Sequence, residues 1–123
     1  MASAINWFEI PVSDMERAIK FYNNIFGISM EVFEMTPGFP MAMFPYESGS
    51  TTGGAIIQGE GYVPSVEGSL VYLNGGEDLT AVINRVEAAG GSITMPKMSI
   101  GENGFIAMFS DSEGNKVGLH SMA

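Results

Sequence analysis

The sequence predicts an α+β fold in which one βαβββ module occurs twice. The tripeptide Ala-Met-Phe occupies residues 42–44 and again residues 107–109, and a glycine follows five residues later in both copies. Two amphipathic helical patterns lie about 63 residues apart, and short β-rich runs bounded by glycine and proline accompany each of them. Two such modules would pack their strands into a curled mixed sheet around a common cavity, with the helices outside.

The first module opens with an apolar, β-rich run over residues 5–12, in which Pro11 fits a strand end or a sheet edge. Ser13 is then expected to cap a helix, because Glu16 three residues later completes a capping box. An apolar face follows at helical spacing, and Gly27 supplies the left-handed residue that ends the helix. The residues of that face are Met15, Ala18, Ile19, Tyr22 and Phe26.

Short strands complete the first module, and the second module repeats the order. A glycine-rich turn is expected at residues 48–54, and a linker at residues 59–68. The second helix begins at about Glu77 and ends at Gly90 and Gly91. The expected strands lie at residues 29–36, 40–46, 55–58, 69–74, 92–96, 105–109 and 116–120. We expect one domain over residues 1–123, with modules at about 1–60 and 68–123.

Composition excludes several function classes. The formal net charge of −9, from 14 acids and 5 bases, argues against nucleic acid and anionic membrane surfaces as partners. The absence of cysteine excludes disulfides, cysteine–zinc sites and cysteine nucleophiles. The chain shows neither a leader pattern nor an apolar run of about 18 residues, so we expect a cytoplasmic protein.

The order of these elements resembles the vicinal oxygen chelate superfamily, also called the glyoxalase/bleomycin-resistance/extradiol-dioxygenase family. The resemblance covers essentially the whole chain and implies a curled sheet around a cavity, a small-molecule ligand and a homodimer. In the first half it is carried by the strand ending at Val12, then Asp14, Arg17, Ala18, Phe21, Tyr22, Phe26 and Gly27. In the second half it is carried by residues 86–91, then Phe109-x-Asp111-x-x-Gly114-Asn115 and residues 117–120.

Enzymes of this family hold a divalent metal ion with four His, Gln or Glu side chains, one from each of four cavity strands. Transferred one at a time, these positions fall on Trp7 and on Ile57 or its neighbour Gln58 in the first half. In the second half they fall on one of residues 69–71 and on Gly118. None of these residues is His, Asp or Glu, so we expect no cofactor. The alternative is Zn, Ni, Mn or Fe held by displaced ligands, with Glu9 and His120 as candidates.

His120, the only histidine, is the first candidate site residue. It is either a hydrogen-bonded residue at the sheet edge, an acid–base or hydrogen-bonding group of the cavity, or a metal ligand. Glu9 is the second, because it shares a strand face with Trp7. We expect Gln58 at the position related by the repeat to His120, and Tyr72 at that related to Glu9. These four residues could form a polar ring, with Glu9 and His120 as catalytic candidates.

Apolar residues could form the remainder of the ligand site. Trp7 and Phe105 could stack on a ring of the ligand, although such residues also serve as core. Ten methionines could likewise be ordinary core or a soft cavity lining.

Three functions stay open at this point. The first is binding of a small, partly apolar molecule in the cavity without a metal ion. The second is a metal-dependent lyase, isomerase or dioxygenase of the glyoxalase type. The third is an interaction protein with a vestigial cavity.

Overall fold

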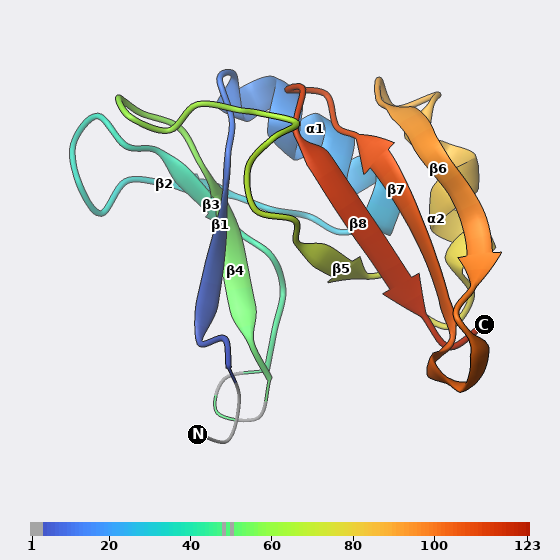
Figure 1. Cartoon of the computed structure of the whole chain (residues 1–123). Helices are drawn as coiled ribbons and strands as arrows, with labels where there is room; N and C mark the ends of the chain where they lie inside the picture. Colours follow the sequence, from blue (N-terminus) through green and yellow to red (C-terminus); the bar gives the residue numbers. More distant parts are fainter. Residues whose placement is uncertain (1–3, 48, 50) are drawn as a thin grey trace.

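The computed structural model describes residues 4–47, 49 and 51–123 (Figure 1). The first half contains β1 (Trp7–Pro11), α1 (Met15–Phe26), β2 (Val32–Phe33), β3 (Met41–Met43) and β4 (Gly53–Ile57). The second half contains β5 (Tyr72–Asn74), α2 (Leu79–Val86), β6 (Ser92–Ser99), the 3₁₀ turn η1 (Gly101–Asn103), β7 (Phe105–Ser110) and β8 (Lys116–Ser121). Each half is therefore a βαβββ unit, as the repeat predicts.

The strands form two four-stranded mixed sheets, with the orders β1-β4-β3-β2 and β5-β8-β7-β6. In each sheet the first strand of the module pairs parallel with the last, and the other pairs are antiparallel. The predicted α+β class is confirmed, and the curled sheet is divided between the two modules. Figure 1 shows the sheets splayed apart below, with their upper ends close together.

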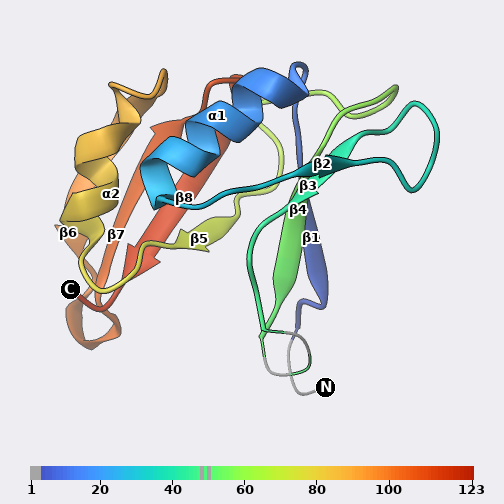
Figure 2. The ribbon, with the colours of Figure 1, turned by 180° about the vertical axis from the view of Figure 1, so that it is seen from behind.

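Both helices lie on the same side of the sheets, as Figure 2 shows from behind. They contact each other, and α2 packs on β6, β7 and β8. Phe21 of α1 packs against Phe109 of β7, with ring centroids 5.8 Å apart, so α1 connects the two modules. The core lies between helices and sheets, and its largest fully buried side chains are Tyr22, Phe21, Phe109, Ile25, Ile56, Leu79 and Leu119. The opposite faces of both sheets carry no helix of the described chain (Figure 1).

The predicted start of the first helix is wrong by one residue. The N-cap is Asp14, whose side chain accepts a hydrogen bond from the backbone N–H of Arg17. Ser13 instead donates from its hydroxyl and its N–H to Glu113, 100 residues away. The second helix is shorter than predicted, since Asp78 caps it and it ends at Val86.

Several strands also differ from the prediction. Only Val32–Phe33 of residues 29–36, Met41–Met43 of residues 40–46 and Tyr72–Asn74 of residues 69–74 pair in a sheet. Strand β6 continues through Pro96 to Ser99, because it is an edge strand with two irregularities in its register. Positions 48 and 50 of the expected turn at residues 48–54 lie outside the described residues, and Gly53 and Gly54 already belong to β4.

No helix within the described ranges is long and apolar enough to cross a lipid bilayer.

Candidate functional site

The candidate site is built on the helix-free faces of the two sheets. In β1, Phe8 and Ile10 belong to the core or pack against it, so the alternating residues Trp7 and Glu9 point to the other face. In β8, Val117 and Leu119 are core residues, so Gly118 and His120 point away from the helices. Strand alternation thus places the predicted residues Trp7, Glu9 and His120 on helix-free faces.

Two aromatic side chains cover a glycine on this face of the first sheet. Trp7 is the direct partner of Gly53 on β4. A Cβ atom on Gly53 would lie 2.7 Å from Cδ1 of Tyr46 and 2.9 Å from Cζ3 of Trp7. The two rings meet edge to face, with centroids 5.9 Å apart. Only glycine therefore lets both rings lie against β4.

The second sheet has a similar arrangement with one ring, at positions that the repeat does not relate to Trp7 and Gly53. Tyr72 is the direct partner of Gly118 on β8, and a Cβ atom on Gly118 would lie 2.5 Å from Cδ1 of Tyr72. Tyr72 keeps 44% of its surface exposed, so one side of its ring stays accessible. Two residues further along β5, Asn74 pairs with His120, and both lie on the same face of the sheet as Tyr72. Tyr72, Asn74 and His120 therefore form one surface at the edge of the sheet.

A hollow of about 510 Å³ opens at this edge. It is lined by Tyr72, Leu73, Asn74, Gly76, Glu77, His120, Ser121 and Met122. The Nε2 atom of His120 lies 2.7 Å from the carbonyl oxygen of Asn103 in η1. Of the predicted site residues, the structure brings Tyr72 and His120 together here.

Glu9 and Trp7 belong to the other sheet. Glu9 is exposed and pairs through the backbone with Ala55. Phe105 packs partly against the core, and the Nζ atom of Lys97 lies 4.7 Å from the centre of its ring. One face of Phe105 is thus already occupied by a cation of the chain itself.

Gln58 points toward the first helix. Its Oε1 atom accepts a hydrogen bond of 2.9 Å from the N–H of Met15, at the start of α1. A second hollow, of about 460 Å³, lies beside it and is lined by Asp14, Met15, Glu16, Ile19, Val32 and Gln58. Gln58 therefore belongs to the helix side of the sheet, and not to the surface that carries His120.

The backbone hydrogen bonds correct the predicted symmetry. The N–H of Val12 donates to the carbonyl of Ile57 at 2.8 Å, and the N–H of Gly75 donates to that of His120 at 2.7 Å. These equivalent bonds relate His120 to Ile57, so the predicted equivalence of Gln58 and His120 is wrong by one residue. One residue along a strand changes the face of the sheet.

The side chains present do not fit the metal site that the resemblance implies. At two of its positions stand Trp7 and Gly118, and the ring of Tyr72 fills the space in which a side chain at position 118 would begin. Among the described residues there is no group of three or more His, Cys, Asp or Glu side chains that could hold a metal ion.

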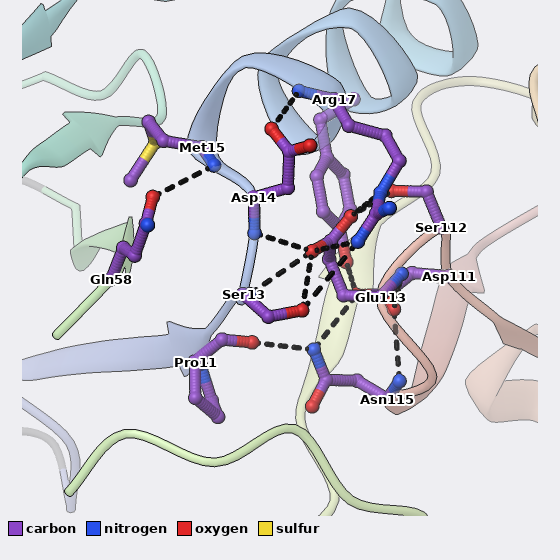
Figure 3. Close-up of polar contacts among 11 residues, drawn as sticks. Pro11, Ser13, Asp14, Met15, Arg17, Gln58, Asp111, Ser112, Glu113 and Asn115 are labelled. Carbon is purple, nitrogen blue, oxygen red and sulfur yellow. Dashed lines mark hydrogen bonds and ion pairs between the residues drawn. The ribbon is translucent and has the colours of Figure 1, made fainter. Parts of the chain in front are cut away.

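An extensive polar network, which the sequence did not predict, lies at the other end of β8 from the hollow. It joins the turn between β7 and β8 to the first turn of α1 (Figure 3). Glu113 accepts hydrogen bonds from the N–H groups of Ser13 and Asp14 and from the hydroxyls of Ser13 and Ser112. It also forms an ion pair with Arg17, whose Nε atom lies 2.6 Å from its Oε2. We call this network the module junction.

The buried carboxylate of Asp111 completes the module junction. It accepts a hydrogen bond of 2.7 Å from the hydroxyl of Tyr22 and one of 3.0 Å from the Nδ2 atom of Asn115. Asn115 also donates to the carbonyl of Pro11 at the end of β1, with an N···O distance of 2.7 Å. The Asp111-x-x-Gly114-Asn115 pattern was the sequence signal for this junction, but its partners lie 89 to 104 residues away.

The junction shifts the pKa values of two of its residues. Burial alone would raise the pKa of Glu113, but the hydrogen bonds from Arg17, Asp14, Ser112 and Ser13 outweigh burial and lower it to about 2. Burial raises the pKa of Tyr22 well above its usual value, and the negative charge of Asp111 and its hydrogen bond to the hydroxyl act in the same direction. Glu113 is therefore ionised and Tyr22 neutral at ordinary pH.

Comparison with known proteins gives consistent matches. The family model described as Glyoxalase/Bleomycin resistance protein/Dioxygenase superfamily matches residues 4–119. A "Glyoxylase-like domain-containing protein" of Didymella fabae is 34% identical over an alignment of 119 residues, and the match covers 90% of this chain and 88% of that protein.

A longer relative and a solved structure are also similar to this chain. "Putative glyoxylase CFP32" of Mycobacterium tuberculosis (strain CDC 1551 / Oshkosh) is 26% identical over 117 residues, and the match covers 93% of this chain. The match covers only 44% of that relative, so the present chain spans less than half its length. The crystal structure of a glyoxalase/bleomycin resistance protein from Albidiferax ferrireducens T118 has a TM-score of 0.73 at 18% identity, covering 95% of this chain and 97% of that one. At that identity the likeness concerns the fold.

Proposed function

Because this chain belongs to the Glyoxalase/Bleomycin resistance protein/Dioxygenase superfamily, we propose that it binds a small, partly apolar molecule on the helix-free faces of its two sheets. In this proposal the ligand is held without the metal ion of the family's enzymes. The main support is the large apolar surface that these faces leave accessible.

Four large apolar side chains on these faces are between 37% and 46% exposed: Trp7, Met43, Tyr72 and Met98. The backbone register assigns the two methionines to these faces, since Met43 pairs with Ala55 beside Glu9, and Met98 pairs with Ile106 beside His120. Covering such side chains is favourable by about 25 cal/mol per Å² of apolar surface. Aromatic rings and adaptable methionines are a suitable lining for a flat apolar molecule.

The metal-free part of the proposal rests on the available ligand atoms. Trp7 and Gly118 stand at two of the expected ligand positions, and the described residues include no group of three or more His, Cys, Asp or Glu side chains that could hold a metal ion. In this proposal Glu9, on the face of Trp7, and His120, on the face of Tyr72, orient the ligand by hydrogen bonds.

The chain provides its own reporter for a binding test, since Trp7 is its only tryptophan. We expect flat aromatic compounds to change the emission of Trp7 and to stabilise the fold by about 2.7 kcal/mol at a hundredfold excess over the dissociation constant. Met43→Ala should weaken binding severalfold. Met35→Ala, at a methionine that is 81% exposed on the loop between β2 and β3, is the matched control and should not.

The alternative is a metal-dependent lyase, isomerase or dioxygenase that uses Glu9 and His120 as displaced ligands. Metal analysis of the purified protein decides between the two. Stoichiometric zinc, nickel, manganese or iron that is lost on Glu9→Gln or His120→Ala would contradict the metal-free proposal. A protein that responds neither to metals, hemithioacetals nor aromatic compounds would instead support a role in interaction only.

The resemblance also leads us to propose a homodimer. Exposed apolar residues of the loop before β5, Val63 at 73% and Val66 at 59%, are candidates for covering by a second copy. Light scattering coupled to size exclusion measures the oligomeric state directly, and a monomer at micromolar concentration would contradict this part of the proposal.

A further inference from the structure

We propose that the hollow beside β5 and β8 is a subsite for a protonated amine attached to an apolar body, and that His120 is held there as a hydrogen-bond acceptor. This inference rests on the proposed function, because it specifies the chemistry of the ligand at one part of the same face. It is carried by the hydrogen bond of His120, by the groups that line the hollow, and by the packing of Tyr72 on Gly118.

The hydrogen bond of His120 determines its tautomer. A carbonyl oxygen can only accept, so at 2.7 Å from the carbonyl of Asn103 the Nε2 atom of His120 must carry the proton. In the neutral ring Nδ1 then has a free lone pair. The carbonyl is held in place, because backbone hydrogen bonds from Ile100 to Gly104 and from Gly104 to Gly101 close the η1 turn.

The remaining nitrogen of His120 is available to a ligand. Within the part of the chain that the structure describes, Nδ1 makes no hydrogen bond. His120 lines the hollow together with Glu77, whose carboxylate is a further acceptor. The side chain of Asn74 is oriented by accepting a hydrogen bond from the N–H of Gly76. Nδ1 of His120 and the carboxylate of Glu77 are therefore two acceptors that the hollow can offer to a donor.

The charge of the lining favours a cation. The eight lining residues include the acid Glu77 but neither lysine nor arginine. The chain as a whole carries a formal net charge of −9, which attracts cations and repels anions. An ammonium group could donate to Nδ1 of His120 and at the same time lie beside the carboxylate of Glu77.

Apolar side chains of the hollow can contact the apolar part of such a ligand. Leu73 and Met122 line it, and Met122 is 64% exposed. The ring of Tyr72 lies flat enough over Gly118 that an added Cβ atom would meet three of its carbon atoms. An exposed aromatic face can also attract a cation through its π electrons. These features together fit an amine that carries a ring or a short aliphatic chain.

The tautomer can be measured without any ligand. Since His120 is the only histidine, one set of imidazole signals appears in ¹H–¹⁵N spectra of the uniformly labelled protein. For the neutral ring we expect the Nε2–H tautomer, with Nδ1 unprotonated. A predominant Nδ1–H tautomer would contradict the inference while leaving the proposed function intact.

The ligand class is tested with three probes of similar shape: benzylammonium, benzyl alcohol and benzoate. We expect benzylammonium to shift the imidazole signals of His120 and to bind at least tenfold more tightly than the other two. Binding of benzyl alcohol or benzoate with equal affinity contradicts the amine subsite, and so does the absence of any shift of His120 by benzylammonium at millimolar concentration. A change of Trp7 emission by apolar compounds, recorded in parallel, reports separately on the proposed function.

A pair of charge-neutralising variants separates local contact from long-range attraction. Glu77→Gln should weaken benzylammonium about tenfold, as expected for loss of an adjacent carboxylate. Glu87→Gln removes the same charge at the other end of α2, outside the hollow, and should change the affinity less than twofold. Equal weakening in both variants would show that only the net charge matters, and would overturn the subsite.

Discussion

The module junction and the helix-free faces use the same residue types in opposite ways. Tyr22 at the junction is fully buried and donates to a buried carboxylate, whereas Tyr72 on the open face is 44% exposed over a glycine. Glu113 accepts hydrogen bonds from four residues of the junction, whereas Glu9 is exposed on its strand. The junction thus fixes the position of the two modules, and the open faces keep apolar surface and hydrogen-bonding groups for a ligand.

The largest effect is expected from Asp111→Ala at the junction. The change leaves the buried hydroxyl of Tyr22 without its acceptor and removes one of the two acceptors of the Asn115 amide, so we expect a loss of about 3–5 kcal/mol in the free energy of unfolding. Urea denaturation measures it. Asp78→Ala, which removes an exposed helix cap, is the control and should cost about 1 kcal/mol. Equal losses of stability in the two variants would show that Asp111 contributes no more than a single exposed helix cap, and would contradict its role in the junction.

Glu113 should make the stability depend on pH. Its pKa in the folded protein is about 2, below its ordinary value of 4.5, so its contribution is complete above pH 4.5 and is lost as the pH falls toward 2. We expect about 2 kcal/mol, less than the full shift implies because the partner Arg17 is half exposed. Unfolding curves of the wild type and of Glu113→Gln should therefore converge in acid. A constant difference across this range would contradict the assignment.

A matched pair of tyrosine variants compares the two regions directly. Tyr22→Phe removes the donor of a buried hydrogen bond to an ionised group and should cost about 1.5–3 kcal/mol. Tyr72→Phe removes a hydroxyl from a residue on the open face and should change stability by less than about 0.5 kcal/mol. Thermal unfolding of both variants gives the comparison. Similar losses would mean that the face of Tyr72 is part of the folded core.

The contrast between the module junction and the helix-free faces also explains which features could be predicted from the sequence. The two modules, both helices and the helix-free position of Trp7 follow from local periodicity, because burial on one face imposes it. The cap at Asp14 could not be predicted, since Ser13 is engaged by Glu113 from the other module. The predicted symmetry of Gln58 and His120 failed for a related reason. A repeat with an uncertain offset of one residue does not determine which face of a strand is exposed.

Residues that join the site through contacts with distant parts of the chain were missed as well. Asn103 orients His120 through its carbonyl oxygen, an atom that every residue type offers, so its identity carries no signal in the sequence. Tyr46 was not expected beside Trp7, because the contact depends on the space above Gly53. The candidate site is therefore defined more by register than by residue type.

Only a small effect on stability is expected from Gly118→Ala on the open face. The added methyl group would lie 2.5 Å from the ring of Tyr72, but that ring is half exposed and can turn outward, so we expect a loss below about 1 kcal/mol. The ring can no longer lie over β8, however, and the affinity for benzylammonium should fall severalfold. In a Tyr72→Ala background the same glycine change should have almost no effect on either quantity. This double-mutant cycle measures the coupling between the two positions, and additive effects would show that the ring does not depend on Gly118 for its place at the site.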